Sequence, residues 1–429
     1  MIRILLLTLA ACGFSPSPTA TSAAAIDLVT PWTRHTIFHG NCDATHQCSG
    51  ADGVHIAGSG EGLLVTAPWE QSSKLTVSTH PGYASVKTAS SWSTTVVPAT
   101  INAPEDSFFA DVDGDGNLDL IGACDAGKKI TISFGPAPYT TTIVLTASVN
   151  YQNWLTIGGF LDVDGDGAPD IVAGGRIGAN SSVGYFTNLT GAWRTASAYT
   201  WTQVGRVGSV YSIVPLDVDG DGDLDLVISD GAPIGSSNTL MGSRWLESPV
   251  AAGGSTWTNH MIHTYNGANQ SARYLWAESG RVIDGSSIDS GTNTGQLAIR
   301  TTSDWSTWSS TTVPWSTMTN AGRYKAVAPA DIDGDGCEDL VVTMHHADSD
   351  PTSSPEDLSG VAWFQSDCAG DWSRGEISGI EGYHFDAPIL YDVDGDGDLD
   401  VIADEQGLPG TIPVSQQLGV VWYENPAVP

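Results

Sequence analysis

Residues 217–227 read DVDGDGDLDLV, and four other segments repeat this pattern almost unchanged. The five copies begin at Asp111, Asp162, Asp217, Asp331 and Asp392, so their starts lie 51, 55, 114 and 61 residues apart. Because 114 is two periods of 57, we expect one degenerate copy between the third and the fourth. A fixed period of this length indicates an architecture of repeated units that pack against their neighbours.

Two further β-rich elements follow each acidic segment. The first is rich in aromatic and apolar residues and recurs at residues 75–77, 130–132, 184–186, 244–246, 297–299, 362–364 and 421–423. The second begins with an aromatic residue, at Trp92, Tyr139, Trp201, Trp257, Trp308 and Trp372. The seventh copy of the second element begins at Trp32, near the start of the chain. The chain therefore ends on a third-strand element and begins with the missing fourth.

This offset predicts an all-β fold, a seven-bladed β-propeller with four-stranded blades. We expect residues 32–37 to form the outer strand of the blade made by residues 386–425, which closes the ring and removes open sheet edges. The single propeller domain is expected over residues 26–429. Its blades are predicted at about 50–98, 99–146, 147–206, 207–264, 265–314, 315–379, and 380–429 with 32–40. The recurring tryptophans are expected to pack in the core, because they hold a fixed place in each repeat.

The acidic segments have the form D-x-D-x-D-G-x-x-D, with carboxylates at positions 1, 3, 5 and 9. Alternate spacing in a tight turn aims several carboxylates at one point, Gly at position 6 permits the turn, and the carbonyl of position 7 can add an oxygen. Such hard oxygen donors suit Ca²⁺ rather than Zn²⁺. An EF-hand is excluded because position 12 is never Glu; it is Gly122, Ala173, Ile228, Val342 and Ala403. Thrombospondin-type calcium repeats are shorter and rich in cysteine, so they are excluded as well.

The acidic loops, their β-rich flanks and the repeat period resemble those of the FG-GAP/VCBS repeat family, which includes the propellers of integrin α-chains. The resemblance covers residues 32–429 and implies that each loop joins strands one and two of a blade and holds Ca²⁺, about five ions in all. The implied ligands are Asp111, Asp113, Asp115 and Asp119; Asp162, Asp164, Asp166 and Asp170; Asp217, Asp219, Asp221 and Asp225; Asp331, Asp333, Asp335 and Asp339; and Asp392, Asp394, Asp396 and Asp400. Residues 58–62 lack aspartate, and residues 279–289 keep Asp284 and Asp289 at the wrong spacing, so no calcium is expected in those two repeats.

The first 25 residues are expected to be a signal peptide followed by a flexible tether. Arg3 precedes a short apolar run, and residues 9–12 (LAAC) resemble the lipobox of bacterial lipoproteins, in which Cys12 would be lipidated. The alternative is ordinary cleavage after residues 23–25. Both interpretations place the protein outside the cytoplasm, secreted or as a cell-surface lipoprotein.

Five cysteines remain after Cys12. Cys42 and Cys48 lie six residues apart in a polar segment and are expected to form a local disulfide. Cys337 and Cys368 fall in one repeat and are candidates for a second one, while Cys124 is expected to be buried as a small apolar residue.

The charge balance excludes some partners. The chain has 49 acidic and 16 basic residues and a formal net charge of −33, so it should repel nucleic acid and anionic membrane surfaces. We expect a monomer that meets a membrane only through a lipid anchor.

Function is expected on the face opposite the calcium loops, where the connections between strands two and three vary in length. Long connections are predicted at residues 344–360 and 404–419, and His345, His346 and Glu405 are the candidate ligand-binding residues. The sequence contains no nucleophile elbow, phosphate-binding glycine loop or HExxH segment, so no catalytic residue is assigned. The leading hypothesis is an extracellular, calcium-stabilised binding or adhesion module for a glycan or protein ligand, because relatives of the family bind sugars and integrins bind proteins. The alternatives are a lyase-like enzyme acting on polysaccharide and a surface scaffold protein.

Overall fold

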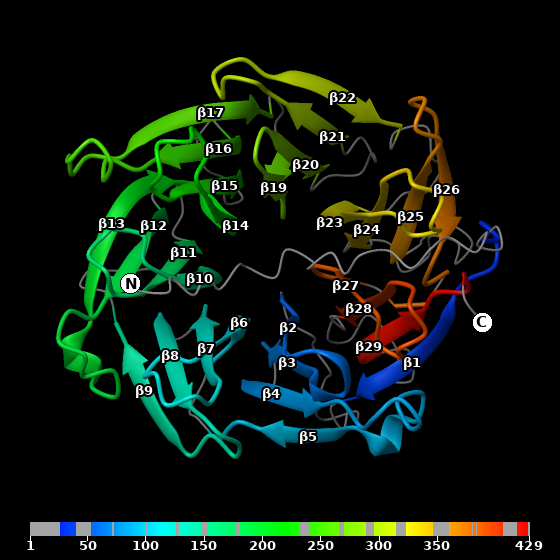
Figure 1. The fold of residues 1–429 in the computed structure, drawn as a ribbon, viewed down its shortest axis with the longest axis horizontal. Coiled ribbons are helices and arrows are strands. Elements are labelled where there is room, and N and C mark those ends of the chain that lie inside the picture. The colour runs from blue at the N-terminus through cyan, green and yellow to red at the C-terminus, as the bar shows by residue number, and fades with distance from the viewer. Residues whose placement is uncertain are drawn as a thin grey trace, which may run out of the picture.

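The structure is a computed structural model. It describes residues 26–39, 53–70, 73–98, 102–125, 128–146, 153–176, 181–231, 241–265, 270–288, 296–314, 323–345, 360–379, 381–382, 384–405 and 418–427. Within these residues there are 29 β-strands and three short 3₁₀ helices, η1 (Gly60–Gly62), η2 (Ala89–Ser91) and η3 (Ala196–Ala198). The strands form seven antiparallel sheets arranged around a central axis (Figure 1). The predicted seven-bladed propeller is therefore confirmed.

The strands of a blade follow one another along the chain, from the axis outward (Figure 1). The first three blades contain β2 (His55–Ala57), β3 (Leu64–Trp69), β4 (Lys74–Thr79) and β5 (Ser93–Val96); β6 (Pro104–Ala110), β7 (Asp119–Cys124), β8 (Lys129–Phe134) and β9 (Thr141–Leu145); and β10 (Asn153–Leu161), β11 (Asp170–Arg176), β12 (Ser181–Thr187) and β13 (Thr200–Val207). Blades 4 and 5 contain β14 (Ser209–Leu216), β15 (Asp225–Gly231), β16 (Gly242–Glu247) and β17 (Thr258–Thr264); and β18 (Gln270–Ala272), β19 (Trp276–Glu278), β20 (Arg281–Ile288), β21 (Gln296–Thr301) and β22 (Ser309–Val313). Blade 6 contains β23 (Arg323–Ala330), β24 (Asp339–His345), β25 (Val361–Ser366) and β26 (Trp372–Glu376), and blade 7 contains β27 (Ile389–Tyr391), β28 (Asp400–Glu405), β29 (Gly419–Glu424) and β1 (Thr33–Phe38).

The ring is closed by the two ends of the chain, as predicted. Strand β1 is the outermost strand of blade 7 and pairs antiparallel with β29, with Thr33 opposite Glu424 and His35 opposite Trp422. The indole of Trp32 is 5% exposed, and its backbone N–H donates to the carbonyl of Ile377 in blade 6 at 3.0 Å. The N-terminal strand thus joins the last blade and also contacts the one before it (Figure 1).

The hydrophobic core lies between neighbouring blades. One cluster joins Trp363 of blade 6 to Tyr423 of blade 7, and another joins Trp422 of blade 7 to Trp69 of blade 1. Strands two and three of a blade face a neighbouring sheet on both sides, which explains their continuous apolar sequences. Of the seven residues that begin fourth-strand elements, Trp32, Trp92 and Tyr139 are buried. The other four are partly buried and pack against core clusters, namely Trp201, Trp257, Trp308 and Trp372.

Blade 5 departs from the repeat. Its first strand is divided into β18 and β19, both paired with β20, and residues 279–280 turn directly from β19 into β20. Asp284 is buried inside β20 and its Oδ1 accepts a hydrogen bond from Arg300 Nε at 2.7 Å. Asp284 therefore belongs to a buried ion pair in a strand and not to a loop. Asp289 lies outside the described residues.

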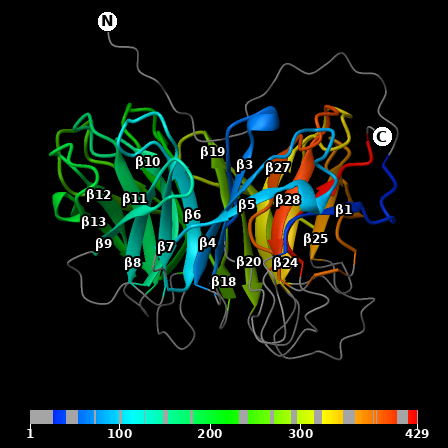
Figure 2. The same ribbon diagram turned by 90° about the horizontal axis from the view of Figure 1, so that it is seen from below.

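Because the four strands alternate in direction, the connections from strand one to two and from three to four lie on one face of the ring. The ends of the second strands and the starts of the third strands lie at the other face (Figure 2). Over the described ranges, no helix is long and apolar enough to cross a bilayer.

Candidate metal centres

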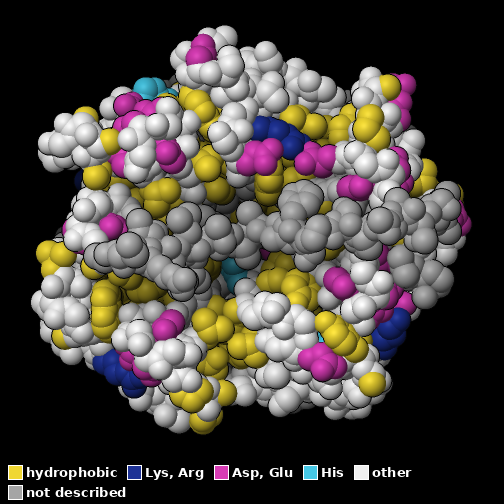
Figure 3. All heavy atoms as spheres, in the orientation of Figure 1, with side chains coloured by type: hydrophobic (Ala, Val, Ile, Leu, Met, Phe, Trp, Pro, Cys, Tyr) yellow, Lys and Arg dark blue, Asp and Glu magenta, His cyan; other side chains and the backbone are white. Residues whose placement is uncertain are grey.

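The five acidic loops connect the first and second strands of blades 2, 3, 4, 6 and 7, and all open on one face of the ring. Figure 3 shows acidic side chains spread around this face. In each loop, three carboxylates place one oxygen each within 4.8 Å of the others. The groups are Asp111, Asp113 and Asp115; Asp162, Asp164 and Asp170; Asp217, Asp219 and Asp225; Asp331, Asp333 and Asp339; and Asp392, Asp394 and Asp400.

Two glycines shape each loop, at positions 4 and 6. Both have positive φ in all five copies, between 72° and 80° at position 4 and between 88° and 101° at position 6. A side chain is strained in this backbone region even where space is open, as it is around Gly114 and Gly116. Sequence reasoning explained only position 6, although Gly also stands at position 4 in every copy.

Backbone N–H groups within each loop orient its carboxylates, even without a bound cation. In blade 3 the N–H of Asp166 donates to Asp164 Oδ1 at 3.2 Å, and the N–H of Gly167 donates to Asp162 Oδ2 at 2.9 Å. The bond from position 5 to position 3 recurs in the other four loops at 3.2–3.3 Å. Such local bonds favour the turn over other conformations of the loop.

The carboxylate at position 9 also clamps the blade together. In blade 7, Asp400 Oδ2 accepts the N–H of Val393 in the loop, and its Oδ1 accepts the N–H of Asn425 after the third strand, both at 2.9 Å. Equivalent pairs of bonds hold Asp119, Asp225 and Asp339. Asp170 accepts the loop bond, from the N–H of Val163, and its buried Oδ1 accepts none in the described part of the structure. This clamp was not predicted, because the partner N–H lies on a different strand.

Burial raises the pKa of the position 9 carboxyls. Loss of hydration is the largest cause, and it raises the pKa of Asp119 to about 6 and that of Asp400 to about 8. The pKa of Asp170, Asp225 and Asp339 is raised to about 7, again mainly by burial, and nearby loop carboxylates add to the shift. Four carboxylates in one small loop are therefore costly to ionise together without a cation. The all-oxygen donor set and the orphaned Asp170 oxygen fit a hard divalent cation.

These shifts predict an unusual dependence of stability on pH. With the position 9 pKa raised above the unfolded value of about 3.9, the metal-free native state holds more protons than the unfolded state between about pH 4 and 8. The free energy of unfolding of the metal-free protein should therefore fall as the pH rises through this window. Calcium requires ionised ligands, so its stabilising effect should grow over the same window.

The measurement is a set of thermal melts between pH 5 and 8, with resin-stripped protein in metal-free buffer and with saturating Ca²⁺. We expect the midpoint difference between the two series to widen as the pH rises. A difference that stays constant with pH would contradict the assignment of these aspartates as coupled ligands.

The cysteine predictions have separate outcomes. Cys337, at position 7 of the blade 6 loop, forms a disulfide with Cys368, with their Cα atoms 5.4 Å apart. Cys124 is a buried free thiol, as expected. The predicted lipidation of Cys12 and the predicted Cys42–Cys48 disulfide lie outside the described residues and stay predictions.

The candidate ligand-binding residues are only partly described. Glu405 ends β28, is completely buried, and accepts the N–H of Leu418 at 3.0 Å. His345 ends β24, its side chain is not described, and His346 lies outside the described residues. His345 and Glu405 end second strands, on the face opposite the acidic loops. The predicted connections 344–360 and 404–419 fall largely outside the described residues.

A buried polar cluster near the same face escaped sequence reasoning. Lys325 Nζ lies 2.6 Å from Asp386 Oδ1 and 2.7 Å from His384 Nε2, and all three side chains are buried. Lys325 lies in the first strand of blade 6, and the other two residues precede the first strand of blade 7. The chain separation of about 60 residues left no local pattern to find them.

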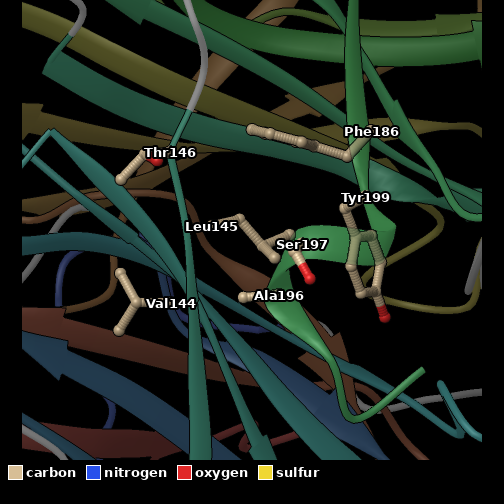
Figure 4. Close-up of a pocket in the computed structure, with 7 residues that line it drawn as sticks. All are labelled: Val144, Leu145, Thr146, Phe186, Ala196, Ser197 and Tyr199. Atoms are coloured by element: carbon tan, nitrogen blue, oxygen red, sulfur yellow. The ribbon is translucent and has the colours of Figure 1, made fainter. Parts of the chain in front are cut away.

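A cavity of about 240 Å³ lies between the outer strand of blade 2 and η3 of blade 3. It is lined by Val144, Leu145, Thr146, Phe186, Ala196, Ser197 and Tyr199 (Figure 4). Tyr199 is its only titratable residue, and its hydroxyl donates to the carbonyl of Trp193. Neither an acidic loop nor a cluster of polar groups converges on this cavity, so it is no candidate for a metal or catalytic site.

Comparisons with known proteins agree with this geometry. A family model described as an FG-GAP-like repeat matches residues 162–228, which span the acidic loops of blades 3 and 4. No curated protein matches the chain.

Several solved structures are similar over most of their length. A hydrazine synthase from Kuenenia stuttgartiensis matches with a TM-score of 0.51 and 13% identity, over 84% of this chain and 93% of that one. A protein from Lactobacillus plantarum (TM-score 0.47, 8% identity, 77% and 86% covered) and the V. cholerae biofilm matrix protein Bap1 (0.43, 12%, 94% and 91%) also match. At these identities the likeness concerns the fold alone. The chain is a seven-bladed β-propeller that contains an FG-GAP-like repeat.

Proposed function

We propose that the chain is an extracellular, calcium-stabilised binding or adhesion module for a glycan or protein ligand. The observation that supports it best is the recurrence of one carboxylate cluster in five of the seven blades, always in the turn between strands one and two. A cation enclosed by such a turn would stabilise the scaffold and leave little room for another ligand. The opposite face is then the surface available for recognition.

The disulfide between Cys337 and Cys368 supports the extracellular location. Disulfides persist in oxidising compartments and are rare in the cytosol. Cys368 is exposed, so it would meet cytosolic reductants. This observation agrees with the export segment expected in residues 1–25.

The proposed ligand face carries aromatic and cationic side chains near the axis. The guanidinium carbon of Arg273 lies 4.7 Å from the ring centre of Tyr211, and the rings of Tyr211 and Tyr274 are 6.3 Å apart. The Nζ of Lys325, which is buried, lies 5.9 Å from the ring centre of Tyr274. Aromatic faces beside cations are suited to polar ligands that also carry apolar surface, as sugars do.

A glycan-array screen with and without Ca²⁺ would test this proposal. We expect the protein to bind a glycan and Tyr211→Ala to abolish this binding. Removal of calcium should weaken binding because it destabilises the fold. Tyr83→Ala is the matched control, because Tyr83 is an exposed tyrosine on the acidic-loop face. If the Tyr83 variant loses binding and the Tyr211 variant keeps it, the ligand lies on the acidic-loop face. Absence of binding to any glycan would leave a protein ligand, or the surface scaffold role.

A second candidate is a polysaccharide-acting, lyase-like enzyme. The cluster of Lys325, His384 and Asp386 is the observation that favours it, because such an enzyme needs a basic group near the polymer. The cluster is buried, however, which favours a structural role. Product release from any glycan that binds, lost in Lys325→Met with binding kept, would establish the enzyme in place of the binding module.

A further inference from the structure

Two of the acidic loops are contacted by a basic side chain from the next blade. Arg194, in the connection between β12 and β13 of blade 3, reaches the loop of blade 2. Its Nη2 lies 3.0 Å from Asp115 Oδ2, and its Nε bonds Asp113. Lys87, in the connection between β4 and β5 of blade 1, reaches the loop of blade 7, where its Nζ lies 2.9 Å from Asp394 Oδ2.

Both contacts have the same construction. Each cation binds the position 3 carboxylate of the neighbouring loop, at Asp113 or Asp394. Each cation also contacts the last residue of the third strand in the blade that it reaches, the residue just before the one whose N–H binds the position 9 carboxylate. Arg194 lies over the ring of Phe134 at 4.7 Å, and Lys87 Nζ lies 2.6 Å from Glu424 Oε1. Because the same arrangement occurs at two places in the ring, we treat the two contacts as one structural feature and not as two unrelated surface ion pairs. Figure 3 shows basic side chains beside acidic ones on this face.

The other three loops differ. Among the described residues, position 3 of these loops (Asp164, Asp219 and Asp333) has no Lys or Arg partner. Asp333 instead accepts a hydrogen bond from the amide of Gln365 in its own blade at 2.5 Å. At Gly165 of blade 3, the neighbouring blade presents Val250. The five loops therefore fall into a group of three whose position 3 carboxylate has no basic partner and a group of two whose position 3 carboxylate has one.

We infer that Arg194 and Lys87 are built-in competitors for calcium, so that the loops of blades 2 and 7 bind it more weakly than those of blades 3, 4 and 6. The inference rests on the proposed calcium function. A divalent ion placed among these carboxylates would stand a few ångströms from a fixed positive charge. Coulomb repulsion at that distance, even at the dielectric constant of water, weakens binding roughly tenfold. Arg194 and Lys87 are nearly half exposed, so salt screens the effect.

Arg194 and Lys87 also act on the two loops when calcium is absent. They neutralise the position 3 carboxylates and tie each loop to the next blade. The acidic-loop face would then load calcium in two steps, with three ions at low concentration and two more at higher concentration.

The test is native mass spectrometry of the full chain, which counts bound Ca²⁺ over a titration at low ionic strength. We expect the wild-type protein to plateau at three ions before reaching five, and Arg194→Gln with Lys87→Gln to reach five in one step. The two loops should gain roughly tenfold in affinity. Arg194→Lys keeps the charge and should restore the wild-type titration.

Arg281→Gln is the matched control. Arg281 also pairs with an acidic-loop residue, but its partner Glu338 stands at position 8 and is no member of the carboxylate group. This variant should leave the titration unchanged. Thermal melts would confirm that every variant is folded.

Two outcomes separate this inference from the function on which it rests. If no ion binds to the wild-type protein, the calcium proposal itself fails. If five ions bind and the double variant shows the wild-type pattern, or loses affinity, the competitor role of Arg194 and Lys87 is overturned while calcium binding stands.

Discussion

Deletion of residues 1–39 is expected to lower the melting temperature by roughly 10 °C and to cause aggregation. The deletion removes β1, the outer strand of blade 7, together with the buried Trp32. Loss of a large aromatic side chain from a core costs about 3–5 kcal/mol, and the ladder bonds to β29 are lost in addition. The exposed edge of β29 would also offer unpaired backbone groups to other chains.

Two controls separate ring closure from a general effect of truncation. Deletion of residues 1–25 should leave the melt nearly unchanged, because those residues are expected to be a signal and a tether. Trp32→Ala should destabilise the protein by about 3–5 kcal/mol, whereas Val29→Ala, at a side chain 79% exposed, should have little effect. Equal melts for the two deletions would contradict the closure of the ring by β1.

Removal of calcium is expected to have the other large effect. Extracellular calcium modules bind with dissociation constants of about 10⁻⁴–10⁻³ M. At ten times the dissociation constant, one site adds about 1.4 kcal/mol to the free energy of unfolding. Five sites, each at ten times its own dissociation constant, would add about 7 kcal/mol, which is comparable with the whole stability of a domain. Chelation should therefore lower the melting temperature strongly, and calcium should restore it.

The contribution of a single loop to calcium-dependent stability can be tested with two substitutions in that loop, one at a proposed ligand and one at a control residue. Asp333→Asn removes one member of the blade 6 carboxylate group and should remove about 1.4 kcal/mol of the calcium-dependent stability. Glu338→Gln alters an exposed neighbour outside the group and should keep the whole calcium response. An unchanged melt after chelation, with no metal found by elemental analysis, would refute the calcium proposal.

The repeat made most of the fold predictable. Five near-identical loops set the period, and the period located the blades. The surplus third-strand element at residues 421–423 and the orphan element at Trp32 together predicted the closed ring, which the pairing of β1 with β29 confirms. These inferences succeeded because each blade is a local unit whose hairpins form between consecutive strands.

The carboxylate groups were predictable in part. Spacing alone placed positions 1, 3, 5 and 9 in one turn, but it could not show that position 9 clamps the loop to the third strand. Nor could spacing show which three carboxylates approach one another in each loop. In blade 2 the third member of the group is Asp115, at position 5, whereas in blades 3, 4, 6 and 7 it is the aspartate at position 9. Those choices depend on burial and on backbone groups supplied by another strand.

The sequence by itself determined the blade count, the strand order, the closure by Trp32 and the positions of the acidic turns, since each follows from a pattern repeated along the chain. Only the tertiary structure decided what neighbouring blades do to one another. Arg194 meets Asp113 across 81 residues, and Lys325 meets His384 across 59. The physical reason is that these contacts depend on how neighbouring blades pack around the ring. Each sheet packs against the next, so a side chain meets partners chosen by the angle and spacing between blades, which no local pattern in the sequence encodes.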